Sequence, residues 1–247
     1  LPVCVTMHDY FSFCPNGAYF NFPRNQPCTL KPMGLPCITS NCDRRMYAHK
    51  LVRVARQNRT DAAIAAIRNL TVVHVAAFAQ AFAQTYLPAH ARHALVPNMI
   101  DAPKRPAAAV AANDAVLFVG RLESEKAPHI LAAAARAVGV PVRFLGDGPM
   151  RQAILDANPE AQMLGWQPPE TVYDHIAAAR CVAAPSLWFE PGPLVIAEAQ
   201  AMGVPGIVSA RTGAASFVRD GSNGLLLPEV SQATLETALT RIMDAGT

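Results

Sequence analysis

Residues 181–202 read CVAAPSLWFEPGPLVIAEAQAM, and their pattern of apolar, loop-forming and helix-forming residues predicts the fold class. Its first four residues, 181–184, are small or apolar and predict a short buried strand. A loop rich in proline and glycine follows, and residues 193–202 then predict a helix that begins at a proline. A buried strand, a loop and a helix in this order form the repeating unit of parallel α/β sheets.

The same alternation continues on both sides of this stretch. The other strands that we expect are residues 115–119, 142–145, 162–164, 206–208 and 224–227. The other helices that we expect are residues 128–138, 150–157, 169–178 and 232–245. By count, these elements complete a doubly wound α/β domain with a parallel sheet.

The first half of the chain shows a shorter version of this pattern. Its expected strands are residues 1–7, 71–75 and 94–96, its expected helices are 43–69 and 79–86, and residues 8–42 read as a loop. Asp43 is the expected N-cap of the first helix. An apolar run opens the chain without an initiator Met, so we expect that the first part of this domain is missing. We therefore expect two Rossmann-like domains, 1–105 and 106–247, with a linker at 102–114.

The composition excludes several classes of protein. The chain has 247 residues, of which 51% are hydrophobic, and this excludes a disordered chain or a small disulfide scaffold. No uninterrupted apolar run reaches the roughly 18 residues that a membrane span needs. The six cysteines are too few for a secreted scaffold, and the first residues given show no basic segment followed by an apolar signal core. We therefore expect a reducing, cytoplasmic location.

Charge is divided unevenly between the two expected domains. Residues 1–105 carry 12 Lys and Arg against 4 Asp and Glu, whereas residues 106–247 carry 9 against 14. The resulting net charges of +8 and −5 predict different partners for the two domains.

Cationic residues follow the expected strand at 115–119. Gly120 lets a ligand approach the backbone, and Arg121 and Lys126 place two positive charges at the carboxyl edge of the sheet. Such a pair suits a diphosphate, because the guanidinium forms directional contacts and the ammonium acts as a point charge. The alternative is a loop whose Arg and Lys are only solvated. The later stretch Gly146-Asp147-Gly148 favours a tight structural turn over a ligand contact.

Two glutamates flank the start of the helix at 193–202. Glu190 lies in the preceding loop and Glu198 lies on the helix. Between them, Gly192, Pro193 and Leu194 begin a helix whose N-terminal amides attract phosphate, and each carboxylate can accept hydrogen bonds from hydroxyls. The alternative is an ordinary helix with acidic residues near its start, although an unpaired Glu198 among apolar residues would be costly.

These residues resemble the signature of a known family. Glu190 and Glu198, preceded by Pro-Ser at 185–186 and followed by Ala-Met-Gly-Val-Pro at 201–205, resemble the family 4 glycosyltransferases, which are retaining enzymes of the GT-B fold. Further fragments that resemble this family are Gly120-Arg121-Leu122 with Lys126, and residues 97–101, 146–149 and 220–226. In such enzymes a nucleotide-sugar binds between two Rossmann-like domains.

The resemblance implies a role for each matching residue. Arg121 and Lys126, with Gly120 and the helix start at Gly192, Pro193 and Leu194, would hold the donor diphosphate. Glu198 would bind the ribose hydroxyls, and Glu190 would face the donor sugar. The segment Thr-Met-His-Asp-Tyr at 6–10 resembles the family's strand-end histidine segment, which implies that His8 approaches the donor sugar. Without the resemblance, a structural role for His8 would be favoured.

The chain departs from the family pattern at three places. We expect that the opening strand, turn and helix of the first domain are missing from this stretch of sequence. Residues 212–216 read Thr-Gly-Ala-Ala-Ser where the family often has Gly-Gly-x-Pro-Glu. By resemblance, we also expect that the last helix, which commonly crosses back to the first domain, lies beyond this stretch. An alternative is therefore that this stretch of chain is inactive by itself.

Four cysteines in the expected loop offer an alternative metal site. They are Cys14, Cys28, Cys37 and Cys42, and thiolates are good zinc ligands. Their spacing contains no Cys-x-x-Cys pair, so we favour free or buried thiols and expect no metal.

The expected helix at 43–69 is strongly basic, with seven Lys and Arg. These cations could bring the protein to anionic lipid headgroups, where a lipid-linked acceptor would reside. The protein would then be peripheral on the inner face of the cell membrane. A solvated helix face is the alternative, and nucleic acid is not an expected partner because no base-stacking aromatic residues are interleaved.

We expect a retaining glycosyltransferase that moves a sugar from a nucleoside diphosphate sugar to a hydroxyl of a glycan or lipid-linked acceptor. Cell-surface polysaccharide or lipopolysaccharide synthesis is the expected context. No cofactor is expected, because the cations and the helix dipole would replace a divalent metal. Two alternatives are a non-catalytic remnant that binds a nucleotide-sugar and a related GT-B epimerase or phosphorylase.

Overall fold

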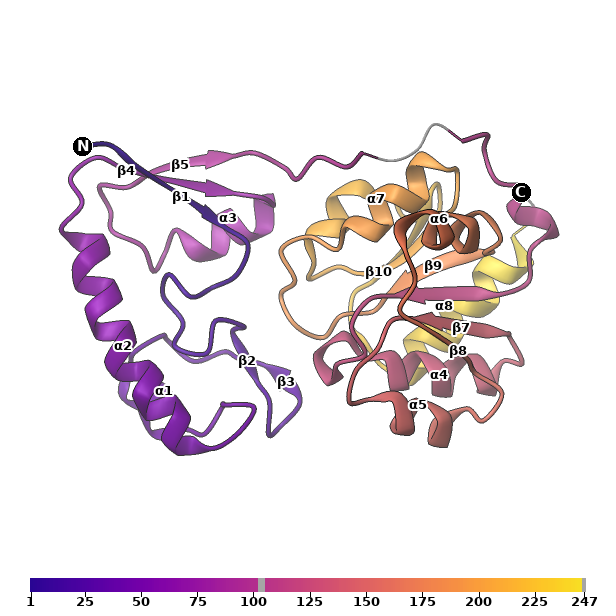
Figure 1. The fold of residues 1–247 in the computed structure, drawn as a ribbon, viewed down its shortest axis with the longest axis horizontal. Helices are drawn as coiled ribbons and strands as arrows, with labels where there is room; N and C mark the ends of the chain where they lie inside the picture. Colours follow the sequence, from indigo (N-terminus) through magenta and orange to yellow (C-terminus); the bar gives the residue numbers. More distant parts are fainter. Residues whose placement is uncertain (102–104, 246–247) are drawn as a thin grey trace. The chain divides into compact units, whose positions relative to one another are not determined.

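The computed structural model describes residues 1–101 and 105–245, which form two compact units (Figure 1). The first unit comprises Leu1–Asn98 and the short segment Trp188–Gly192. The second comprises the described residues of Met99–Leu187 and Pro193–Thr247. The division therefore falls after Asn98 rather than at 105, and one segment from the second half of the sequence belongs to the first unit.

The second unit is built on a six-stranded parallel sheet. The strand order is β11-β10-β9-β6-β7-β8. The strands are β6 (Val116–Val119), β7 (Val142–Leu145), β8 (Gln162–Gly165), β9 (Cys181–Ala184), β10 (Gly206–Ser209) and β11 (Gly224–Leu227). The direction of winding reverses between β6 and β9, as in doubly wound Rossmann-like sheets. This topology confirms the predicted α/β fold class.

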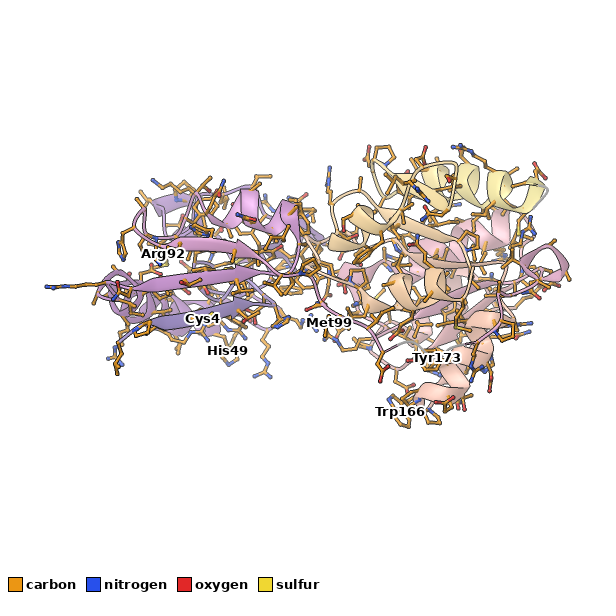
Figure 2. The ribbon with its side chains drawn as sticks, turned by 90° about the horizontal axis from the view of Figure 1, so that it is seen from above. Cys4, His49, Arg92, Met99, Trp166 and Tyr173 are labelled. Carbon is orange, nitrogen blue, oxygen red and sulfur yellow. The ribbon has the colours of Figure 1, made fainter. Side chains whose placement is uncertain are left out.

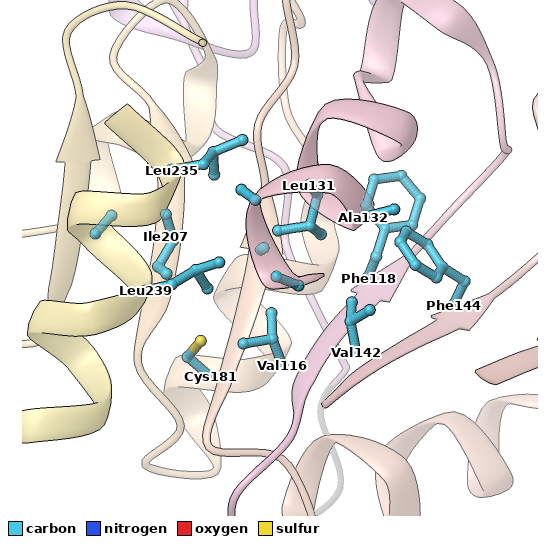
Figure 3. Close-up of a cluster of buried hydrophobic side chains, with 14 of the residues drawn as sticks. Val116, Phe118, Leu131, Ala132, Val142, Phe144, Cys181, Ile207, Leu235 and Leu239 are labelled. Atoms are coloured by element: carbon cyan, nitrogen blue, oxygen red, sulfur yellow. The ribbon is translucent and has the colours of Figure 1, made fainter. Parts of the chain in front are cut away.

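Helices cover both faces of this sheet. One face carries α4 (Pro128–Ala137), α5 (Arg151–Ala157) and α8 (Gln232–Asp244), and the other carries α6 (Pro169–Ala177) and α7 (Leu194–Ala201). Figure 3 shows the first of the two cores, where Leu131 of α4 and Leu239 of α8 pack against Val116 and Phe144 of the strands. Each fully buried leucine contributes about 2 kcal/mol, so these contacts hold both helices on the sheet.

The first unit contains a smaller parallel sheet of three strands in the order β1-β4-β5. They are β1 (Val3–Met7), β4 (Leu70–His74) and β5 (Arg92–Leu95), and the longer helices of this unit are α2 (Tyr47–Ala65) and α3 (Ala77–Ala83). Leu70 and Val72 of β4 pack with a group of aromatic side chains that includes Tyr10, Phe13 and Tyr19.

The predicted elements agree best with the structure in the second unit. Between residues 115 and 245, every predicted strand and helix is present, and each end differs by at most one residue. Of the expected linker, residues 102–104 lie outside the described residues, and Val110–Ala112 forms one turn of 3₁₀ helix.

The prediction of an irregular loop at residues 8–42 was incomplete. This region contains β2 (Phe20–Asn21), β3 (Gln26–Pro27) and α1 (Leu35–Thr39). Elements of two to five residues are too short to give a periodic pattern, which is why the sequence does not reveal them.

The prediction that Asp43 is a helix N-cap was wrong. Helix α2 begins at Tyr47 after Met46, and no side chain caps it. Asp43 is buried, where its carboxylate accepts a hydrogen bond from the Arg45 amide at 2.9 Å and pairs with Arg53 Nε at 3.2 Å. A buried carboxylate needs such partners, and this requirement outweighs the benefit of capping.

Candidate functional site

The winding of the large sheet reverses between β6 and β9, and the loops that follow these two strands meet. The Leu187 amide, in the loop after β9, donates a hydrogen bond to the Glu125 carbonyl, in the loop after β6, at 2.8 Å. In open α/β sheets, ligands bind in the crevice at this edge, where the strand order reverses. The two loops that the sequence singled out are therefore neighbours in the second unit.

Two of the predicted phosphate ligands lie in the loop after β6. The Lys126 side chain points back to the start of this loop, because a Cβ placed on Gly120 would lie 3.8 Å from Lys126 Nζ. Arg121 is exposed, and its Nη1 lies 3.3 Å from Glu123 Oε1. An exposed ion pair of this kind is worth no more than about 1 kcal/mol, so the guanidinium can turn to an anion at little cost.

The glycines after β7 are required by the packing of the neighbouring loop. A Cβ on Gly146 would lie 2.0 Å from the Gly120 carbonyl oxygen, and a Cβ on Gly148 would lie 2.5 Å from the Leu122 carbonyl oxygen. The Leu122 amide also donates to Asp147 O at 2.9 Å. This stretch is thus a structural turn that fixes the backbone of the cationic loop, as the sequence favoured.

A cavity of about 380 Å³ opens at the carboxyl ends of β6, β7 and β8. Its lining includes Gly120, Arg121, Trp166, Gln167 and Val172. A second hollow of about 240 Å³ shares Trp166, Gln167 and Val172 and adds Pro169, Tyr173 and Glu198. Figure 2 labels Trp166 and Tyr173, which lie on the same side of the second unit. The shared lining makes one groove that runs from the cationic loop to Glu198.

Glu198 lies in the middle of α7, at the far end of this groove. Its side chain is half-buried, and burial raises the pKa of its carboxyl above the ordinary value for glutamate. A half-buried carboxylate that lines a hollow is suited to accept hydrogen bonds from hydroxyl groups of a ligand. Helix α7 begins at Leu194 after Pro193, and the Pro193 side chain does not cap its first turn.

The structure places the other predicted sugar-facing residues in the first unit. His8 is exposed and directly follows β1, at the carboxyl end of that strand. Glu190 is buried and lies in the segment Trp188–Gly192. A Cβ on Gly192 would lie 3.3 Å from the Asn98 side-chain amide nitrogen. Gly192 therefore lies next to Asn98, the last residue of the stretch Leu1–Asn98 of the same unit.

The four loop cysteines do not form a metal-ligand group. Within residues 1–101 and 105–245, no three His, Cys, Asp or Glu side chains are grouped to hold a metal ion. All four are free thiols, and burial raises the pKa of the Cys14 thiol to about 12. Among them lies Lys50, which is fully buried and donates to the carbonyls of Cys37 and Ser40. Lys50 is therefore not part of an exposed basic surface.

Sequence reasoning missed three residues that line the groove. Trp166 and Gln167 follow β8, and Tyr173 lies on α6. The position of Trp166 and Gln167 directly after a strand was a usable signal, but none of the three residues belongs to a recognisable motif.

The family described as "Glycosyl transferases group 1" matches this chain over residues 113–245. Curated relatives include a GDP-mannose-dependent alpha-mannosyltransferase of Corynebacterium glutamicum, which is 34% identical over 51% of this chain and 31% of its own length. An exopolysaccharide phosphotransferase of Streptomyces coelicolor is 30% identical over 62% of this chain and 17% of its own length. The chain therefore spans less than a third of each of these relatives.

Solved structures share the fold of this chain. The HepE protein of Anabaena, solved in complex with UDP-glucose, has a TM-score of 0.68 at 20% identity and covers 98% of this chain, which spans 63% of it. A sucrose-phosphate synthase of Thermosynechococcus elongatus has a TM-score of 0.66 at 22% identity over 76% of this chain and 52% of its own. These similarities establish the GT-B type of fold.

Proposed function

The chain belongs to the glycosyl transferases group 1 family, and on that premise we propose that it moves a sugar from a nucleoside diphosphate to an acceptor hydroxyl with retention of anomeric configuration. The observation that best supports this is the hydrogen bond from the Leu187 amide to the Glu125 carbonyl at 2.8 Å. It joins the loops after β6 and β9, so the cations and the helix amides would serve one crevice.

The groove of the second unit would hold the nucleoside diphosphate part of the donor. Arg121, Lys126 and the first amides of α7 would bind the diphosphate, because both cations and helix N-termini attract anions. Glu198 would accept hydrogen bonds from the ribose hydroxyls. The exposed Trp166 indole, which lines both hollows, offers a flat apolar surface for the base.

The reaction would need no covalent adduct with the protein. The acceptor oxygen attacks C1 of the sugar on the face from which the diphosphate departs, so the C1–O bond to phosphate breaks as the new glycosidic bond forms. The proton of the acceptor hydroxyl passes to an oxygen of the leaving diphosphate. Arg121 and Lys126 would stabilise the charge that develops there, and Glu190 and His8 would orient the sugar. The two fixed cations and the helix dipole would supply the charge that a divalent metal provides elsewhere.

Helix α2 supports a proposal for the acceptor. Val52, Arg56 and Arg59 are spaced so that they share one face of the helix, and all three are exposed, with Val52 70% exposed. Exposed apolar and cationic side chains on one face suit the interface of an anionic membrane. We propose that the protein lies on the inner face of the cell membrane and acts on a lipid-linked or glycan acceptor. None of the described helices is both long and apolar enough to cross a bilayer.

Incubation of the protein with a panel of UDP-, GDP- and ADP-sugars tests the proposed function. We expect one donor to release its nucleoside diphosphate faster than in a protein-free control, with the anomeric configuration retained in the product. Absence of release with every donor would contradict the transferase.

The same panel separates the alternatives. Saturable binding without release would identify a remnant that only binds the nucleotide-sugar. Interconversion of one nucleotide-sugar into another would identify an epimerase, and a requirement for inorganic phosphate would identify a phosphorylase.

A further inference from the structure

The segment Trp188–Gly192 belongs to the first unit although β9 and α7, which flank it in sequence, belong to the second. It carries Glu190, the residue that the proposed function places against the donor sugar. What holds this segment therefore determines where the Glu190 carboxylate lies.

One side chain of the first unit makes a direct hydrogen bond to this segment. The Tyr10 hydroxyl donates to the Phe189 carbonyl oxygen at 2.6 Å, across 179 positions of sequence. Tyr10 is only 1% exposed, so this bond is shielded from competing water. The Tyr10 backbone is itself fixed, because its amide donates to Gly17 O at 2.9 Å and its carbonyl accepts from the Cys14 amide at 2.7 Å.

Aromatic side chains hold the same segment from a second direction. The Phe189 ring stacks on Phe82 of α3, with centroids 5.4 Å apart and planes 21° apart. It also lies 6.1 Å from the Tyr19 ring. Tyr10 makes edge contacts with both of these rings, at 5.7 Å and 6.4 Å. The hydrogen bond and the ring contacts thus fix Phe189 on both its backbone and its side chain.

Glu190 follows Phe189 directly and has little freedom of its own. Its amide donates to the Trp188 carbonyl at 2.8 Å, which closes a tight turn, and its side chain is 8% exposed. Burial and the nearby Glu190 carboxylate both raise the pKa of Tyr10 far above its ordinary value. The hydroxyl therefore keeps its proton and remains a donor.

We propose that Tyr10 is a positioning residue, whose hydroxyl holds the backbone at Phe189 and thereby sets the place of the Glu190 carboxylate. The role in turnover rests on the proposed function. The role in holding the segment does not, because it follows from the hydrogen bond alone.

Tyr10→Phe tests this proposal, with Tyr86→Phe as the matched control. Tyr86 belongs to the same aromatic group, and its hydroxyl lies 3.3 Å from the Tyr19 hydroxyl, while its ring contacts Phe13, Tyr19 and Phe82. Each variant removes one hydroxyl and keeps the ring. The measurements are hydrogen exchange of the amides in 188–192, kcat with the accepted donor sugar, and the Kd of its nucleoside diphosphate.

We expect Tyr10→Phe to speed exchange in 188–192 and to lower kcat about tenfold, while the nucleoside diphosphate Kd is unchanged. Tyr86→Phe should change none of the three. Equal effects of both variants on exchange, or unchanged exchange in Tyr10→Phe, would overturn the proposal. If the unaltered chain turns over no donor, the proposed function fails, and the exchange measurement alone then decides the role of Tyr10.

Discussion

Among the site residues, Glu198 is the one whose effect on nucleotide binding the structure predicts most specifically. It lines the groove from α7 and is half-buried. Glu198→Gln keeps the shape but replaces a charged acceptor with a weaker neutral one, so we expect the Kd for nucleoside diphosphate to rise about tenfold. Titration calorimetry checks this, with Glu160→Gln, an exposed glutamate of the second unit, as the control. Equal affinity in both variants would remove Glu198 from the site.

The raised pKa of Glu198 also predicts a pH dependence of binding. Because burial favours the neutral acid, this carboxyl takes up its proton at a higher pH than an ordinary glutamate. The protonated form is a poorer acceptor, so nucleotide affinity should fall as the pH is lowered, starting above the ordinary titration range of glutamate. Affinity measured against pH should lose this step in Glu198→Gln. A step that persists in the variant would assign it to another group.

At the scale of elements, the turn after β7 predicts a large effect on stability. In Gly146→Ala the new Cβ would lie 2.0 Å from the Gly120 carbonyl oxygen, at a residue whose φ is +128°. We expect a loss of about 3 kcal/mol in the free energy of unfolding. Gly139→Ala is the control, because Gly139 also has a positive φ but has no atom within 4 Å of its Cβ position. Its expected loss is about 1 kcal/mol. Urea unfolding measures both variants. Equal losses in their free energies of unfolding would contradict the close packing of the loop after β7 against the loop after β6.

We predict that the exposed face of helix α2 binds anionic membranes. Arg59→Glu reverses one charge on the exposed face that it shares with Val52, which should weaken binding to anionic vesicles by about 2 kcal/mol, or roughly 30-fold. The exposed Arg219 of the second unit gives the matched control, Arg219→Glu. Vesicle sedimentation at low salt measures both variants. Failure of the unaltered chain to bind at low salt would exclude the membrane proposal.

The same element shows where sequence reasoning succeeds and where it stops. The spacing of apolar residues predicts a helix within 43–69, and α2 lies inside that range. Lys50 is one of the seven cations counted in the predicted basic helix, but its side chain is fully buried against backbone carbonyls. The periodicity of apolar residues predicts which face of a helix is mostly buried. Whether the Lys50 side chain is buried depends on backbone carbonyls of the preceding loop, whose sequence shows no periodic pattern.

For the whole molecule, the strands and loops that build the groove were predictable because each is local in sequence. Gly120, Arg121 and Gly146 directly follow a strand, and Glu198 lies on the helix that comes next after β9. The assignment of Trp188–Gly192 to the first unit was not predictable. It depends on Tyr10 and Phe82, which are far from the segment in sequence. The residues expected to face the sugar, His8 and Glu190, thus belong to one unit, and those expected to hold the nucleotide belong mainly to the other.

Proton NMR of the unaltered chain tests directly whether it is a retaining glycosyltransferase. The chain is incubated with UDP-, GDP- and ADP-sugars, and water serves as the acceptor where no other is supplied. We predict that the anomeric signal of one donor declines and that a sugar signal of the same anomeric configuration first replaces it. Unchanged anomeric signals for every donor, or a product that first appears with the opposite configuration, would contradict the account.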